Sequence, residues 1–311
     1  MQVSRADKLA AALVGRAALR GRTAEAITGW ALLGPALAVL LVMIAWPLFQ
    51  GIRLSFYDAF LLRPLSSAVW VGMANYLRLA ADPNVTVYLR NQVIWVTGTV
   101  AGEVGLGFLL ALILNRDLRY RAFWRSIVLL PWAMPIAATA LIWQWIFNAE
   151  WGIANYMLRQ VGVLQESISW YSAPWRLWFV LLTTSVWRHF PFAYVSLLAG
   201  LQAIPREVVE SAEIDGAGPT AIFRTVTLPL MKPVLWAVVL LLAIWRMNDF
   251  STIWTMTRGG PGIDSMTFAP LVYVTAFSYF RFSQAAAIGV VMLMISLLLT
   301  TLYLKRTRMV E

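Results

Sequence analysis

Six apolar stretches constrain this chain more than any other feature of its sequence, because each is long enough to cross a lipid bilayer. They lie at 30–52, 91–114, 123–147, 176–200, 233–256 and 282–304. A bilayer core about 30 Å thick takes roughly 20 helical residues, and lipid offers backbone groups no hydrogen bonds, which favours helices. The chain is 60% hydrophobic and 13% charged. We therefore predict an all-α polytopic membrane protein with six transmembrane helices, in which residues 29–311 form one domain.

The placement of basic residues predicts the orientation. Six spans put both termini on one side of the membrane. Basic residues cluster on that side, at Arg116, Arg119, Arg121, Arg125, Lys305, Arg306 and Arg308. Since Lys and Arg favour the cytoplasmic side, both termini are expected there. The opposite side also carries Arg53, Arg63, Arg78 and Arg90, so the bias is not clean.

Composition narrows the possible partners and chemistry. The chain has a net charge of +10 but no basic block interleaved with aromatic residues. This pattern favours contact with anionic lipid and predicts no binding of nucleic acid. There is no cysteine and only one histidine, His189, so we expect no metal site and no catalytic residues. Residues 1–28 form a basic cytoplasmic tail, either an amphipathic helix on the inner leaflet or a partly disordered segment.

One polar segment, residues 202–232, separates the fourth and fifth spans. Its charges place it outside the hydrocarbon. Pro205 suits a first helical position, after which Val208, Val209 and Ala212 fall on one side of a helix and Glu207, Glu210 and Glu213 on the other. Asp215-Gly216 predicts a turn. A second short helix is expected to run through Phe223 to a break at Leu228-Pro229.

This segment resembles the EAA loop of ATP-binding-cassette importer permeases. The resemblance rests on Glu210, Ala212, Asp215, Gly216, Ala217, Phe223 and Leu228-Pro229, with Ser211 in place of the middle alanine. Further motifs resemble carbohydrate-uptake permeases of the maltose and trehalose type. They are Trp187, Pro191-Phe192, Leu198-Ala199-Gly200-Leu201, Ile204-Pro205, Asn248-Asp249-Phe250 and Gly259-Gly260-Pro261.

The resemblance implies a specific assembly in a bacterial or archaeal inner membrane. The chain would pair with a second homologous permease subunit, an ATPase dimer and an external solute-binding protein. A cytoplasmic coupling helix would meet the ATPase through Glu207, Glu210, Ser211, Ala212, Glu213, Asp215, Gly216 and Ala217. The chain has no Gly-x-x-x-x-Gly-Lys-Ser/Thr stretch, so we expect no cofactor in it and assign ATP and Mg²⁺ to the partner ATPase.

Polar groups inside a span are costly and mark candidate functional sites. Arg246, Asn248 and Asp249 lie in the fifth span. Arg246 and Asp249, three residues apart, either form a structural ion pair or serve the solute. The substrate pathway is predicted from Arg246, Asn248, Asp249, Trp254, Trp187 and Tyr194. A carbohydrate is the expected substrate, while the Arg246 guanidinium leaves open an anionic derivative such as glycerol phosphate or a uronide oligomer.

Two other functional classes remain as alternatives. An ion-coupled secondary transporter would use Glu103, Arg246 and Asp249 as a charge relay, but no inverted repeat is evident. Glu103 lies beside Gly98, Gly102, Gly105 and Gly107, and this small-residue face favours close helix packing over a binding site. A membrane-embedded enzyme is disfavoured, because no nucleophile and base are clustered. Finally, Pro131 and Pro135 predict a bend in the third span.

Overall fold

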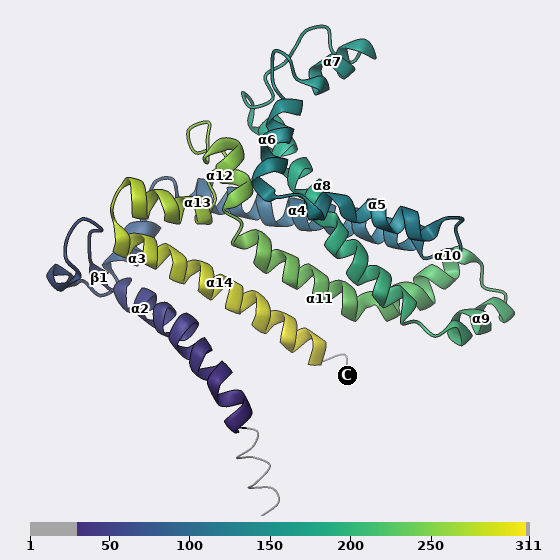
Figure 1. Cartoon of the computed structure of the whole chain (residues 1–311), viewed down its shortest axis with the longest axis horizontal. Helices are drawn as coiled ribbons and strands as arrows, with labels where there is room; N and C mark the ends of the chain where they lie inside the picture. The colour runs from purple at the N-terminus through teal and green to yellow at the C-terminus, as the bar shows by residue number, and fades with distance from the viewer. Residues whose placement is uncertain (1–29, 309–311) are drawn as a thin grey trace, which may run out of the picture. The chain divides into compact units, whose positions relative to one another are not determined.

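The computed structural model describes residues 30–308, and the tail predicted over 1–28 lies outside them. Two compact units divide the chain, Met1–Leu54 and Ser55–Glu311, both drawn in Figure 1. The described part of the first unit is one helix, Trp30–Leu54, which contains a π-helical turn at Leu41–Ala45 and then α2 (Trp46–Leu54). Its apolar side chains are exposed along its length. This helix agrees with the first predicted span.

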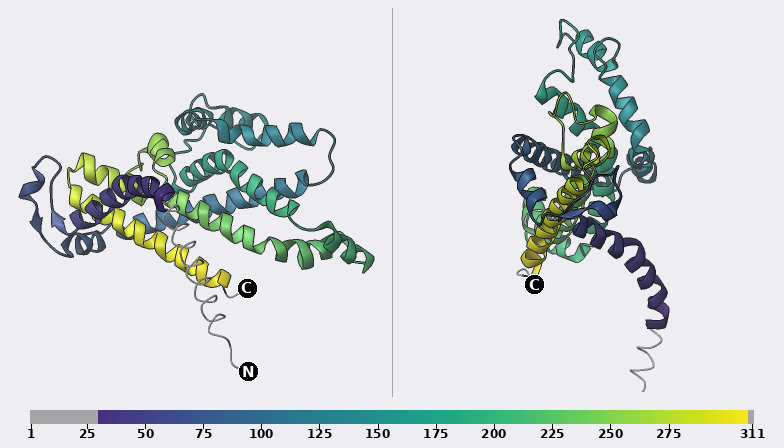
Figure 2. Two further views of the ribbon diagram at one scale, coloured as in Figure 1. Left: turned by 60° about the horizontal axis from the view of Figure 1, so that its bottom comes forward. Right: turned by 90° about the vertical axis from the view of Figure 1, so that its left-hand side faces the viewer.

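The second unit begins with small elements at one end of its helical bundle. Strands β1 (Tyr57–Asp58) and β2 (Val69–Trp70) pair antiparallel, with a 3₁₀ turn between them (Leu65–Ser67) and α3 (Ala74–Ala80) after them. The buried Asn75 amide donates to the carbonyls of Ser55 (2.8 Å) and Tyr57 (2.7 Å). Figures 1 and 2 show these strands at the opposite end of the unit from α9 (Arg206–Ile214).

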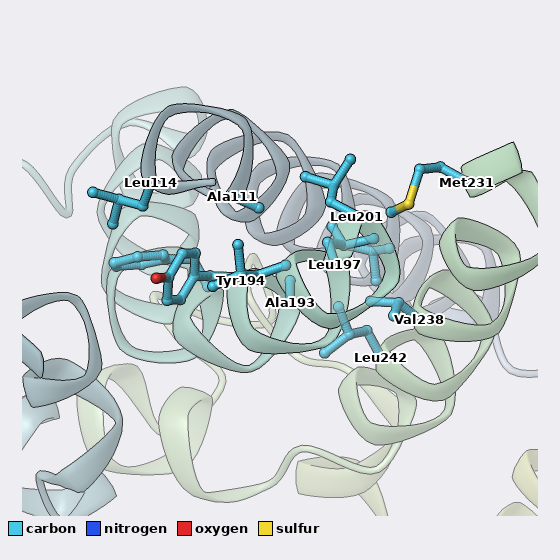
Figure 3. Packing of buried hydrophobic residues seen from close by; sticks show 12 residues of the cluster. Ala111, Leu114, Ala193, Tyr194, Leu197, Leu201, Met231, Val238 and Leu242 are labelled. Carbon is cyan, nitrogen blue, oxygen red and sulfur yellow. The ribbon is translucent and has the colours of Figure 1, made fainter. Parts of the chain in front are cut away.

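Four long helices make up the body of the second unit. They are α4 (Val85–Leu114), α8 (Pro174–Gln202), α11 (Leu228–Met247) and α14 (Phe282–Arg308). Buried side chains of α4, α8 and α11 interlock in a hydrophobic core (Figure 3). Shorter helices lie between these or at the ends, namely α7 (Ile153–Gln160), α12 (Ser251–Thr257) and α13 (Phe268–Tyr273), which continues into a π turn at Val274–Ser278.

Glycines allow α4 to approach α8 closely. A Cβ added at Gly107 would lie 2.7 Å from the backbone nitrogen of Tyr194. Gly98 and Gly102 face the side chains of Leu182 and Val186 in the same way, whereas Gly105 faces open space. The small-residue face predicted around Glu103 is therefore a helix-packing face, as small residues let helix backbones come together.

The third predicted span, 123–147, differs from the structure. Two helices, α5 (Arg121–Ala133) and α6 (Ile136–Ile146), stand at 93° to each other. Met134 between them is extended, with ψ 140°, because a residue that precedes a proline avoids the helical region. Pro131 and Pro135 were expected to bend one helix, and the structure shows instead a full break at Pro135.

The fifth predicted span, 233–256, differs at both ends. The helix begins earlier, at α10 (Pro219–Ile222), continues through a π turn (Phe223–Thr227) and ends at Met247. The predicted break at Leu228-Pro229 is therefore absent, since the Leu228 N–H bonds to the Phe223 carbonyl in the π turn and such turns accommodate proline. We call the continuous helix Pro219–Met247 the rod and residues 248–250, which separate it from α12, the joint.

Four helices in residues 30–308 are long and apolar enough to cross a membrane: Trp30–Leu54, Val85–Leu114, Pro219–Met247 and Phe282–Lys305. The bent pair α5 and α6 gives a fifth if it counts as one span. The 29-residue α8 is long enough, but Arg176, Arg188 and His189 make it more polar than these helices. Six spans and the orientation of the termini stay predictions.

Candidate functional site

An exposed acidic helix forms the first half of the 202–232 loop. Helix α9 begins at Arg206. We predicted Pro205 at the first helical position, and the structure places it one residue earlier, at the N-cap. Glu207 lies in the first turn, where a carboxylate is favoured by the helix dipole. The carboxylates of this segment, Glu207, Glu210, Glu213 and Asp215, are exposed. They form no ion pair with any residue of the described range 30–308.

Gly216 ends α9 as the sequence predicts. Its φ of +82° is left-handed, which glycine adopts without the Cβ penalty of other residues. The Ala217 N–H donates to the Ala212 carbonyl (2.9 Å) and the Gly216 N–H to that of Glu213 (3.0 Å), the hydrogen-bond pattern of a Schellman C-cap. The chain direction therefore changes sharply between α9 and α10.

Sequence reasoning missed one apolar residue on the acidic side of α9. Ile214 is 86% exposed. At 100° per residue it falls between Glu207 and Glu210 on the helical wheel, which was a signal available in the sequence. Val208, on the other side, is exposed as well. An aliphatic side chain amid unpaired carboxylates suits contact with a partner surface that is apolar and basic.

The second half of the loop is held by the helical bundle. The Phe223 ring lies 6.2 Å from that of Phe108 on α4. Further along the rod, Met231 is fully buried, and a Cβ added at Gly200 of α8 would meet its side chain at 3.0 Å. The rod therefore connects the turn after α9 to helices that pack closely against it.

Buried charges meet where the rod ends. Arg246 on α11 and Glu103 on α4 are both buried, Glu103 with 0% exposure. Arg246 Nε lies 3.7 Å from Glu103 Oε1. Arg246 Nη1 also donates to Asp249 Oδ2 over 3.0 Å, which is the pairing expected from their spacing. We call Glu103, Ser185, His189, Arg246 and Asp249 the charge cluster.

Helix α8 adds two polar groups to the charge cluster. Ser185 Oγ donates to Glu103 Oε1 (3.4 Å), and His189 Nδ1 lies 3.2 Å from Arg246 Nη1. Two buried atoms, Glu103 Oε2 and Arg246 Nε, have no hydrogen-bond partner among residues 30–308. From the sequence we interpreted the small-residue face around Glu103 as helix packing and grouped Glu103 with Arg246 and Asp249 only in the ion-coupled alternative. The structure places the Arg246 guanidinium and the Ser185 hydroxyl beside the Glu103 carboxylate.

Hydrogen bonds also fix the joint itself. Asp249 accepts from the Thr252 N–H (3.2 Å) and hydroxyl (3.0 Å), which satisfies donors at the start of α12. The Trp95 indole donates to the Arg246 carbonyl (3.1 Å). Asn248 is exposed, and its amide donates to the Ile244 carbonyl (2.8 Å). Asp249 thus supports the fold, whereas Asn248 keeps its amide oxygen available.

The other predicted pathway residues lie apart from the charge cluster. Trp254 packs between the rings of Phe250 (5.4 Å) and Tyr273 (4.7 Å). Trp187 contacts Trp143 edge to face at 5.7 Å. Tyr194 is buried in the hydrophobic core (Figure 3). Of the six predicted residues, Arg246 and Asp249 are in direct contact, and the assignment of all six to a substrate pathway stays a prediction.

A row of aromatic rings crosses three helices beside the joint. Phe192 of α8 lies 6.0 Å from Trp132 of α5 and 4.7 Å from Trp245 of α11. Trp132 is 45% exposed and Trp245 41%. We call Trp132, Phe192, Trp245 and Asn248 the aromatic face. Sequence reasoning did not assemble it, because its members come from separate helices and only their packing brings them together.

Comparison with known proteins gives a consistent result. The family described as "Binding-protein-dependent transport system inner membrane component" matches residues 103–308. The inner membrane ABC transporter permease protein YcjO of Escherichia coli is 34% identical, over 89% of this chain and 93% of its own length. The trehalose/maltose transport system permease protein MalF of Thermococcus litoralis is 34% identical, over 90% and 94%.

A solved structure shares the fold. It is the crystal structure of a bacterial alginate ABC transporter in complex with an alginate pentasaccharide-bound periplasmic protein. One of its chains superimposes with a TM-score of 0.80 at 18% identity, covering 93% of this chain and 97% of its own length. This chain therefore has the same fold as that chain.

Proposed function

This chain belongs to the family of binding-protein-dependent transport system inner membrane components, and from that premise we propose that it is the permease subunit of an ATP-driven carbohydrate importer. The single observation that carries the coupling role is the exposed acidic face of α9, joined through Gly216 to the packed rod. The ABC permease relative named for trehalose and maltose, 34% identical over 90% of this chain, supports a carbohydrate as the cargo.

The partner that drives transport is an ATPase dimer with a basic and partly apolar cleft. Glu207, Glu210, Glu213 and Asp215 repel one another on the free surface, so cations opposite them would relieve that repulsion. Such charges set register and specificity of docking more than affinity. Ile214 would supply the apolar contact. The small side chains of Ser211, Ala212 and Ala217 would let the surface of the ATPase approach α9 closely.

Movement would reach the solute path through the rod. Closure of the ATPase dimer on ATP displaces α9, and the rod transmits that displacement to the joint because a continuous helix with a packed side is stiff. The joint, together with the break between α5 and α6, allows the outer parts of these helices to tilt separately. In this scheme the chain itself holds no nucleotide, and ATP and Mg²⁺ bind the partner.

The aromatic face would line the path. Apolar faces of pyranose rings stack on exposed indole rings, as Trp132 and Trp245 provide, and the Asn248 amide oxygen can accept a hydrogen bond from a sugar hydroxyl. Arg246 does not favour an anionic solute, because Glu103 and Asp249 already flank its guanidinium. We therefore prefer a neutral sugar over a sugar phosphate or uronide.

The complete assembly would contain four partner subunits of three kinds besides lipid and cargo. They are a second permease subunit, two ATPase subunits and an external solute-binding protein. The 202–232 loop and both termini would face the cytoplasm, and the end with β1 and β2 would face outward. The charge cluster does not suit an ion-coupled carrier, because its carboxylates are committed to Arg246, Ser185 and Thr252.

Reconstitution tests this proposal. The chain is co-purified with the products of its neighbouring genes and placed in proteoliposomes with the solute-binding protein, and uptake of labelled maltose or trehalose is measured. We expect uptake that requires ATP and the binding protein. Uptake that follows a proton or sodium gradient without ATP would overturn the proposal and return attention to Glu103 and Asp249.

A further inference from the structure

Glu103 takes no part in the aromatic face, yet it is a fully buried carboxylate inside a long apolar helix. Placing a charge there is costly unless other charges and hydrogen bonds compensate it. Three ionic groups meet at this point, because Arg246 lies 3.7 Å from Glu103 and 3.0 Å from Asp249. The Arg246 guanidinium is therefore flanked by a carboxylate of α4 and one of the joint.

Arg246 is bonded in a way that fixes the last turn of the rod. Its side chain reaches inward to α4 and α8, where Glu103, Ser185 and His189 surround it, and its carbonyl accepts from Trp95. These bonds come from outside α11. They therefore restrain how far the turn can rotate about the helix axis.

The exposed members of the aromatic face flank Arg246 on that same turn. Trp245 precedes it, Asn248 follows two residues later, and both are exposed while Arg246 is buried. Neighbouring helical residues point about 100° apart, so an inward Arg246 turns Trp245 to the open side. Loss of the inward bonds would let the turn rotate and move both side chains.

We infer that Glu103, acting through Arg246, is a positioning residue for solute recognition: it holds Trp245 and Asn248 toward the path without touching the solute. The inference rests on the proposed function. It differs from a relay of ions, which would need Glu103 to change partners, and from a purely structural ion pair, which would leave solute affinity unchanged once the protein is folded.

The test compares variants of the full complex in proteoliposomes, with ATP-driven uptake measured against solute concentration. Glu103→Gln removes one negative charge and keeps the size of the side chain. We expect its KM to rise about tenfold while the maximal rate per folded complex stays within about twofold, the split expected when binding geometry is disturbed. Glu103→Asp keeps the charge and should lie nearer the wild type. Glu150→Gln, at an exposed carboxylate, is the matched control.

A double variant separates charge balance from packing. Glu103→Gln with Arg246→Gln leaves the summed charge of Glu103, Arg246 and Asp249 as it is in the wild type, whereas either single change shifts that sum by one unit. We expect the KM of the double variant to lie closer to the wild type than that of Arg246→Gln alone. This comparison with Glu103→Asp also decides the case in which Glu103→Gln does not fold.

Two outcomes are kept distinct. The positioning role is overturned if the folded Glu103 variants keep the wild-type KM, or if the effects of the two substitutions on the KM are additive in the double variant. In that case ATP-driven uptake by the wild type still supports the proposed function. Absence of ATP-driven uptake in the wild type overturns the proposed function itself.

Discussion

Arg246 Nε lies 3.7 Å from Glu103 Oε1, and this contact joins the end of the rod to the middle of α4. The opposite end of the same rod begins three residues after Gly216, at Pro219. At about 1.5 Å per residue the 29-residue rod spans roughly 40 Å. One continuous helix thus runs from the turn after α9 to the charge cluster.

Charge reversal on α9 should weaken assembly with the ATPase. Glu210→Lys places a cation in the acidic face, so we expect the amount of ATPase retained during purification to fall about tenfold at low salt, since like charges at an interface disfavour docking. Glu166→Lys, at an exposed position in another loop, is the control. Equal retention in both variants would argue against α9 as the docking surface.

Loss of an aromatic ring beside the joint should reduce solute affinity. Trp245→Ala removes an exposed ring that packs at a tilt against Phe192. We expect the KM for uptake to rise about tenfold or more, the scale of one lost aromatic contact of roughly 1–2 kcal/mol. Trp175→Ala, an exposed tryptophan at the start of α8, serves as the comparison. If neither substitution changes the KM, the aromatic face does not contact the solute.

A methyl group at Gly107 should push α4 away from α8. The added Cβ would lie 2.7 Å from a backbone nitrogen of α8, and overpacking of this kind costs about 1–3 kcal/mol. Gly105→Ala meets no atom within 4 Å and should be neutral. Thermal unfolding in detergent compares the two. A Gly107→Ala protein as stable as Gly105→Ala would mean that α4 and α8 pack differently.

The sequence predicted those features that depend on local composition. Apolar length located the helices over 30–52 and 282–304, and the Asp215-Gly216 pair located the turn with φ +82°. The spacing of Arg246 and Asp249 predicted their ion pair, which the structure confirms at 3.0 Å. Each of these signals lies within one turn or one helix.

Other features depend on tertiary packing and were not predictable in the same way. Hydropathy extends the fifth span through 256, because Ile253, Trp254 and Met256 are apolar, although the helix stops at Met247. The stop is favoured because the Trp95 indole donates to the Arg246 carbonyl at the end of α11 and Asp249 accepts from the Thr252 N–H at the start of α12. Likewise, nothing local to Glu103 indicates that Arg246 lies beside it.

The central claim is that movement of the 202–232 loop drives solute translocation, and the ratio of ATP hydrolysed to sugar imported tests it most directly. The ratio is measured in proteoliposomes for Gly216→Val and Gly216→Asn. Valine is strained at the left-handed φ of this turn, by about 1–2 kcal/mol or more, whereas asparagine adopts it readily. We predict that the valine variant still assembles and hydrolyses ATP but imports little sugar, while the asparagine variant stays coupled. A valine variant with the wild-type ratio would contradict the claim.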